Sequence, residues 1–249
     1  MNKKLVIVSS FKCNGILNDD TEHLSLYTEL GWELYTSGLK AKEMAIKGEI
    51  NNQDYIMTHP ERMFIYKDIG CNVIEYNEEY IKSFNGEVID LTKNLMSILS
   101  YYNHRKLTEN ELMALSYNNS KPSFIPDKPF VCFVLRLRDH VSFRGGPINF
   151  WQNEMNSVLS KNLDVYCVGK GANNFVPNGV KCVNLEDYVS LIKNPLCQYS
   201  IGPSSGCMLL NYCFGKSPTK ILFFQDDINF VDQGDGVGHL LFFGKQGNL

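Results

Sequence analysis

The stretch that most constrains the fold is residues 201–218, which reads IGPSSGCMLLNYCFGKSP. An apolar run stops at Pro203, and two serines and a glycine then lead into an apolar run of helical length that closes at Gly215. This order predicts a buried strand, a tight turn and a helix with a glycine C-cap. A helix that begins at Ser204 or Ser205 directs unpaired backbone N–H groups toward an anion, which we expect to be a diphosphate. The alternative is that one serine only caps the helix.

Composition limits the classes of protein that this chain can belong to. Apolar residues make up 44% and charged residues 20% of its 249 residues, which is typical of one large or two small globular domains. The net charge of -3, without a block of Lys or Arg, disfavours a nucleic-acid partner. The longest apolar runs have the length of strands, so we expect no integral membrane segment. Most of the eight cysteines lie in apolar runs without C-x-x-C spacing, which indicates a reducing compartment and predicts a cytoplasmic protein without zinc.

Strand-like and helix-like segments alternate along the chain. This alternation predicts the α/β class, with two small Rossmann-like domains and a cleft between them. A polar, proline-containing stretch, residues 118–129, separates the two halves, so we predict domains at 1–122 and 123–249. The expected strands are 4–9, 54–58, 71–76 and 87–91 in the first half, and 130–137, 164–168, 180–183, 197–202 and 220–224 in the second. In the first half, a helical segment around residues 24–39 is expected to break at Gly31 and Gly38.

Two further strand ends in the second half carry polar residues. Arg136 and Arg138 follow an apolar run directly, and an arginine fork matches the oxygens of a phosphate. The alternative is a structural ion pair between Arg138 and Asp139. Gly169 and Lys170 end the next strand, where a glycine lets the backbone approach a ligand closely, although a plain turn explains them equally well.

The strand end LRLRDH, residues 135–140, together with residues 201–218, resembles the nucleotide-sugar half of GT-B glycosyltransferases. The closest groups are the fucosyltransferase-like and heptosyltransferase-like proteins. The resemblance implies that Arg136 and Arg138 bind the donor pyrophosphate, with Ser204, Ser205 and Gly206 opposite. Val134 and Leu137 stand where the fucosyltransferase-like group has a His and a second Arg, which argues against GDP-fucose as the donor.

Two absences refine the mechanism that the resemblance implies. The chain lacks the E-x7-E pair of retaining GT-B enzymes around the predicted helix, and it lacks a D-x-D motif at a strand end. We therefore expect an inverting reaction without a metal or other cofactor, in which arginine and the helix dipole neutralise the leaving diphosphate. An inverting transfer needs a general base, for which the first half offers Asp20 and His59. Both residue types serve more often as surface or capping groups.

The predicted function is transfer of a sugar from a nucleoside-diphosphate sugar to a hydroxyl of a glycan or similar acceptor. Two alternatives stay open. One is a degenerate module that binds a glycan or a partner without catalysis. The other is a different Rossmann-like nucleotide-dependent enzyme, which the absence of G-x-G-x-x-G after the first strand disfavours.

Overall fold

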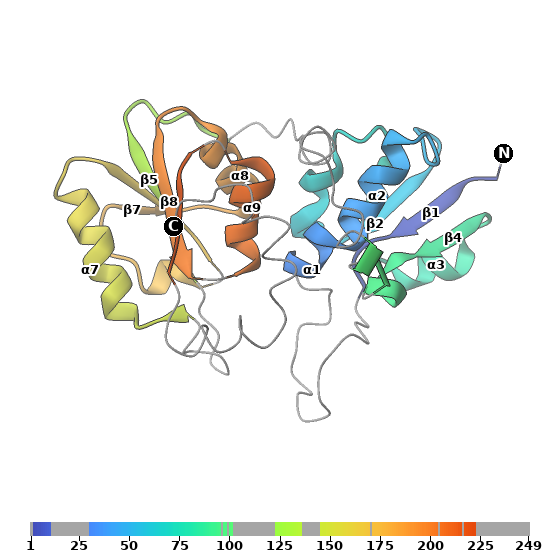
Figure 1. The fold of residues 1–249 in the computed structure, drawn as a ribbon, viewed down its shortest axis with the longest axis horizontal. Coiled ribbons are helices and arrows are strands. Elements are labelled where there is room, and N and C mark those ends of the chain that lie inside the picture. The colour runs from blue at the N-terminus through green and yellow to red at the C-terminus, as the bar shows by residue number, and fades with distance from the viewer. Residues whose placement is uncertain are drawn as a thin grey trace, which may run out of the picture. The chain divides into compact units, whose positions relative to one another are not determined.

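A computed structural model describes residues 2–10, 30–95, 97–98, 100–101, 123–135, 145–169, 171–203, 205–215 and 217–222. The chain forms two compact units, Met1–Asn119 and Ser120–Leu249, each built on its own parallel sheet (Figure 1). The predicted boundary between residues 122 and 123 adjoins residues 102–122, which lie outside the described ones, so it stays a prediction. No helix in the described part of the chain has the length and apolar character needed to span a membrane.

The sheet of the first unit has the strand order β3-β2-β1-β4, with all neighbours parallel. Its strands are β1 (Lys4–Ile7), β2 (Tyr55–Thr58), β3 (Asn72–Glu75) and β4 (Glu87–Asp90), and its helical elements are α1 (Leu30–Tyr35), α2 (Ser37–Ile46), η1 (Pro60–Tyr66), α3 (Glu78–Ser83) and η2 (Leu91–Asn94). Leu5, Ile7 and Met57 form the buried cluster on one face of the sheet, and aromatic side chains from α3 pack against it. Parallel strands covered on both faces need such continuous apolar runs.

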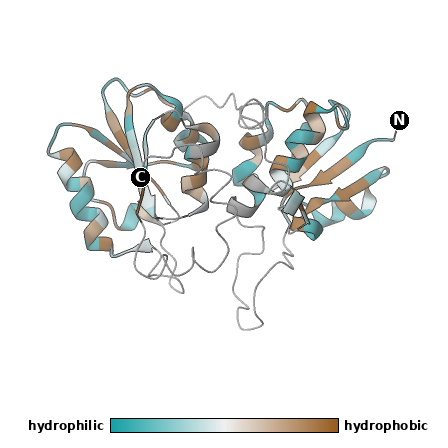
Figure 2. Ribbon diagram, in the orientation of Figure 1, coloured by the Kyte–Doolittle hydropathy of each residue, from teal (hydrophilic) through white to brown (hydrophobic). Residues whose placement is uncertain are grey.

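The sheet of the second unit has the order β7-β6-β5-β8-β9, again fully parallel. Its strands are β5 (Phe130–Val134), β6 (Asp164–Val168), β7 (Val180–Cys182), β8 (Cys197–Pro203) and β9 (Thr219–Leu222), and its helical elements are α7 (Ile148–Leu159), η4 (Ala172–Asn174), α8 (Leu185–Lys193) and α9 (Gly206–Phe214). Hydrophobic residues fill β5 and most of β6, whereas α7 is hydrophobic on one side only (Figure 2).

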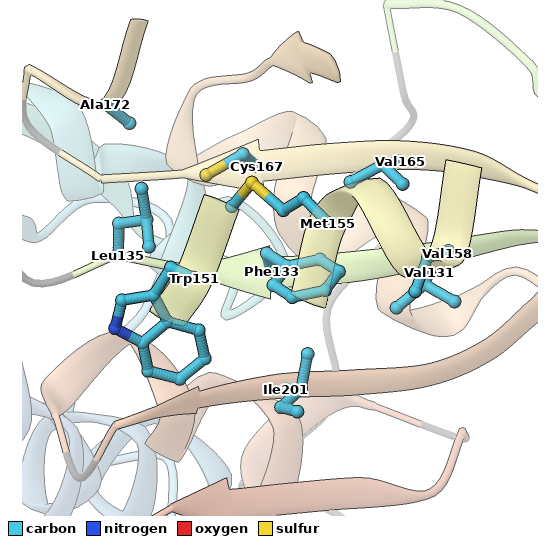
Figure 3. Packing of buried hydrophobic residues seen from close by; sticks show 10 residues of the cluster. All are labelled: Val131, Phe133, Leu135, Trp151, Met155, Val158, Val165, Cys167, Ala172 and Ile201. Carbon is cyan, nitrogen blue, oxygen red and sulfur yellow. The ribbon is translucent and has the colours of Figure 1, made fainter. Parts of the chain in front are cut away.

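The core of the second unit lies between α7 and its sheet. Trp151 and Met155 of α7 pack onto Phe133 and Cys167, and all four side chains are almost fully buried (Figure 3). The indole Nε1–H of Trp151 donates to the carbonyl oxygen of Gly145 at 2.5 Å, which satisfies the polar atom of this buried ring. This core fixes the strands whose carboxyl ends carry the predicted site.

The predicted α/β class, with a Rossmann-like parallel sheet in each half, is confirmed. Every expected strand is present, with ends that differ by a few residues. The helical segment before β2 differs from the expectation. It breaks at Thr36 between α1 and α2, and α2 continues through Gly38 to Ile46. Only a glycine fits at this position of α2, because a Cβ on Gly38 would lie 2.5 Å from the hydroxyl of Tyr66 and 2.6 Å from the carbonyl oxygen of Glu33.

A buried carboxylate ties α1 to the second strand and the turn after it. The side chain of Glu33 is fully buried, and its oxygens accept hydrogen bonds from Thr58 Oγ1, Tyr66 Oη and Arg62, each at 2.6 Å. Because Arg62 also supplies the counter-charge, the carboxylate is both paired and hydrogen-bonded, as a buried charge must be. Desolvation, and then the negative charge of Glu33, hold the pKa of Tyr66 well above its ordinary value. The tyrosine therefore stays protonated at neutral pH and donates a hydrogen bond to Glu33.

Breaking this pair should destabilise the first unit strongly. We expect Arg62→Met to lower the free energy of unfolding by about 3–5 kcal/mol, because it leaves the Glu33 carboxylate buried without a cation. Urea unfolding followed by circular dichroism measures the change. As a control, Lys93→Met removes the exposed partner of Asp90, a surface pair at 3.4 Å, and should cost less than about 1 kcal/mol. Equal losses of unfolding free energy in the two variants would contradict the description of Glu33 and Arg62 as a buried, stabilising ion pair.

Candidate functional site

The candidate site lies where the strand order of the second sheet reverses. β5 and β8 are neighbours, with Phe133 opposite Ile201, and the strands that follow each of them in the chain lie on opposite sides of the pair. In open α/β sheets ligands bind at the carboxyl ends of the strands at such a switch point. The segments that leave this point are those after Leu135 and after Pro203, which are the two polar motifs singled out in the sequence.

Two glycines let the backbones approach closely at this edge. A Cβ on Gly202 would lie 2.7 Å from Cβ of Val134 and 2.8 Å from Sδ of Met208, so the residue before the turn must lack a side chain. A Cβ on Gly169, at the end of β6, would overlap the carbonyl oxygen of Leu135. The ends of β5, β6 and β8 are therefore packed together, and Gly169 belongs to the same edge as the start of α9.

Ser205 is the N-cap of α9, and Gly206 is the first helical residue. The backbone of Ser205 is extended, and its Oγ accepts a hydrogen bond from the backbone N–H of Met208 at 3.4 Å. A capping hydroxyl still has its own proton to donate. The first turn of a helix also has backbone N–H groups with no carbonyl one turn earlier, and its dipole is positive at this end. The start of α9 thus offers hydrogen-bond donors and partial positive charge to an anion.

Four predicted donor-binding residues, Arg136, Arg138, Lys170 and Ser204, lie outside the described residues, and their roles stay predictions. Arg136 follows Leu135, whose N–H donates to the carbonyl oxygen of Val168 at 2.9 Å. The chain therefore leaves β5 beside the end of β6.

In the first unit, Asp20 also lies outside the described residues, whereas His59 caps the 3-10 helix η1. Its Nδ1 accepts a hydrogen bond from the N–H of Glu61 at 3.1 Å, and Pro60 follows as the first helical residue. Partial burial, and then the positive charge of Arg62, lower the pKa of His59 below its ordinary value of 6.5. His59 is therefore neutral at pH 7, with its proton on Nε2 because Nδ1 is an acceptor. This geometry accounts for His59 as a cap, and its role as a base stays a prediction.

The sequence reading missed a polar cluster at the switch point of the first sheet, where β1 and β4 are neighbours. Asp90 ends β4, and its Oδ1 accepts hydrogen bonds from the backbone N–H of Thr92 at 3.1 Å and from Thr92 Oγ1 at 2.6 Å. Ser10 Oγ lies 3.2 Å from Thr92 Oγ1, and the neighbouring Ser9 is fully buried, without a hydrogen-bond partner for its Oγ. Asp90 and Thr92, two residues apart at the end of a strand, form a local capping pattern, which could have identified this one contact but not the approach of Ser10. Asp90 thus places a carboxylate at the carboxyl end of β4.

Among the described residues, no group of three or more His, Cys, Asp or Glu side chains is arranged to hold a metal ion. Six cysteines, at positions 71, 132, 167, 182, 197 and 207, are free thiols. Burial raises the pKa of Cys71 to about 11 and holds that of Cys132 well above its ordinary value, so these two thiols stay protonated at neutral pH.

No protein-family model and no curated protein matches the sequence. Solved structures do match the fold. An ADP-heptose lipopolysaccharide heptosyltransferase II from E. coli superposes with a TM-score of 0.52 at 12% identity, over 89% of this chain and 84% of the other. The iron-containing dodecameric glycosyltransferase TibC from enterotoxigenic E. coli gives 0.51 at 12% identity, over 88% of this chain and 57% of TibC. This chain therefore spans little more than half the length of TibC.

At these identities the likeness shows the fold alone. The fold is GT-B-like, with a Rossmann-like parallel sheet in each of the two units, and both matched structures share it. The heptosyltransferase-like side of the predicted resemblance therefore holds for the fold, whereas the fucosyltransferase-like side stays a prediction.

The close approach at Gly202 can be tested by adding one methyl group. Gly202→Ala should lower the free energy of unfolding of the second unit by about 1–3 kcal/mol, because the new Cβ overlaps Val134 and Met208. Urea unfolding of the two proteins measures the difference. Gln198→Ala, an exposed change on the same strand, should stay within about 0.5 kcal/mol of wild type. An unchanged Gly202→Ala variant would show that β5 and α9 are not packed this tightly.

The lowered pKa of His59 predicts a pH dependence of stability. Between the folded pKa and 6.5 the unfolded chain binds more protons at His59, so its contribution to stability is full above pH 6.5 and is lost as the pH falls through the folded value. His59→Asn keeps a capping oxygen and should remove this part of the loss between pH 8 and pH 5. Urea unfolding at the two pH values and an NMR titration of the histidines measure both quantities. A His59 that titrates at or above 6.5 would contradict the prediction.

Proposed function

We propose that this protein is a glycosyltransferase that transfers a sugar from a nucleoside-diphosphate sugar to a hydroxyl of a glycan or similar acceptor. The observation that carries the proposal is the position of the capped N-terminus of α9 at the β5–β8 switch point of a GT-B fold. Helix N-termini at such points bind phosphates. One of the two matching proteins above is named for ADP-heptose, and the other, TibC, was solved in complex with ADP-heptose, so ADP-linked sugars come first among the donors to test.

The donor diphosphate would lie between the start of α9 and the segment after β5. Ser205 and the backbone of Gly206 donate to it from one side, and the guanidinium groups of Arg136 and Arg138 neutralise it from the other. Gly169 and Lys170 complete the edge. As the bond between the anomeric carbon and the diphosphate breaks, these groups stabilise the negative charge that develops on the leaving oxygen. With the charge of the diphosphate neutralised by these groups, the proposed transfer needs no metal ion.

The acceptor hydroxyl attacks the anomeric carbon from the side opposite the diphosphate, which inverts the configuration, while a base removes the hydroxyl proton. We propose that the first unit supplies this base. Asp20 is the first candidate, and His59 and the strand-end Asp90 are the others. The alternative is a module that binds a nucleotide sugar without transferring it. The use of Nδ1 of His59 as a cap acceptor makes His59 the weaker candidate for the base.

Three of the described cysteines, Cys132, Cys167 and Cys197, are buried free thiols, which is consistent with the cytoplasm, where nucleotide sugars are available. We include this location in the proposal.

Nucleotide binding tests the donor site. Isothermal titration with ADP, GDP, UDP and CMP should show that one of them binds, with no effect of EDTA. Arg136→Ala should weaken that binding about 10- to 100-fold, because it removes a charged hydrogen bond to phosphate worth about 1.5–3 kcal/mol. Lys128→Ala is the matched control. Lys128 pairs with Asp164 at 2.9 Å, at the amino end of β6 and therefore at the opposite edge of the sheet, so its loss should leave binding unchanged. Failure of every nucleotide to bind would refute the donor site.

Donor turnover separates an enzyme from a binding module. With the nucleotide sugar that binds, we expect slow hydrolysis by the wild type and a loss of at least about 100-fold in Asp20→Asn, the size of a general-base contribution. Asp90→Asn and His59→Asn are compared in parallel, because each keeps a capping oxygen. Binding without turnover in the wild type would support the non-catalytic alternative.

A further inference from the structure

One aromatic side chain at the carboxyl edge of the second sheet, that of Phe175, is partly exposed to solvent. Phe175 is 42% exposed, and Ile125 is the other large hydrophobic residue that stands exposed in the described part of this unit. Ile125 precedes β5 and therefore belongs to the amino end of the sheet. Phe175 instead follows η4, just beyond the end of β6.

The turn that carries Phe175 is anchored on both sides. Ala172 is almost fully buried and lies near Leu135 at one end of the core cluster, the end formed by the carboxyl termini of the strands (Figure 3). Val176 packs against the same cluster. The N–H of Phe175 donates to the carbonyl oxygen of Ala172 at 2.9 Å, and its own carbonyl oxygen accepts from Nε2 of Gln152 at 2.7 Å. The backbone of Phe175 is therefore held in place while its ring remains exposed.

The turn that carries Phe175 and the start of α9 follow strands at the same edge of the sheet. α9 begins after β8, and β6 is separated from β8 by β5 alone, so the distance across the edge is two strand spacings, or about 10 Å. A nucleoside diphosphate spans such a distance. Along the way Gly169 has no side chain, and a Cβ on Gly171 would meet no atom within 4 Å.

We infer that Phe175 is the surface on which the nucleobase of the donor stacks. This inference rests on the proposed function, because it assigns the far end of the same nucleotide site. Bases stack on exposed aromatic rings with little preference for sequence, since every base has a π-face. Because the turn already holds the backbone of Phe175, little backbone entropy is lost when the base binds.

The experiment compares a nucleotide with its phosphate part alone. The nucleoside diphosphate that binds most tightly to the wild type, and inorganic pyrophosphate, are titrated into the wild type, Phe175→Ala, Phe175→Leu and Phe175→Trp. Loss of stacking should weaken nucleotide binding about 5- to 150-fold in the Ala and Leu variants, while Phe175→Trp keeps it and pyrophosphate binding stays unchanged throughout. The Leu variant retains the apolar bulk and removes only the aromatic face. Ile125→Ala is the control for an exposed hydrophobic residue at the other edge.

The outcomes distinguish this inference from the proposed function. Equal nucleotide affinity in the wild type and in Phe175→Ala overturns the stacking role and leaves the donor site intact. An equal loss for nucleotide and pyrophosphate also overturns it, because the ring would then act on the phosphate end. A wild type that binds no nucleotide overturns the proposed function and, with it, this inference. Thermal melting of each variant, expected to match that of the wild type because the ring is exposed, confirms that the proteins are folded.

Discussion

The parallel pairing of β5 with β8 is the contact on which the candidate site depends. It brings together two chain segments more than sixty residues apart, and it makes their carboxyl ends neighbours. The pairing is possible at that end only because Gly202 carries no side chain against Val134 and Met208. A register slip of one residue would turn the buried side chains of a strand toward the opposite face, so the apolar core and the site geometry are fixed by the same contact.

The two units use their carboxyl edges differently. In the first, polar groups near the edge are largely satisfied by one another: Glu33 accepts from three partners, and Asp90 is engaged by Thr92. In the second, the start of α9 presents donors to an anion, and the aromatic ring of Phe175 remains exposed. This difference supports the proposal that the second unit is the part that binds the donor.

The sequence predicted the strands well because parallel strands buried on both faces are continuous apolar runs with sharp ends, as in FVCFV and DVYCV. It also predicted that Ser204 or Ser205 would open a helix, since the cap, the apolar run and Gly215 agree. It did not predict the Glu33 cluster or the contact between Thr92 and Ser10. Those contacts join residues that lie 25 or more positions apart, and no local pattern records which polar groups will meet. The exposure of Phe175 could not be predicted either, because the sequence does not show which aromatic residues in loops are buried.

The anchoring of the turn between Gly169 and Val176 has a consequence for how specificity can change. Its two fixed points, Ala172 and Val176, belong to the core, whereas the residues between them add little to the packing. Substitutions between these points can therefore alter the ligand surface without disturbing the sheet. Natural selection or design could therefore change the ligand specificity of the protein through this turn without a loss of stability.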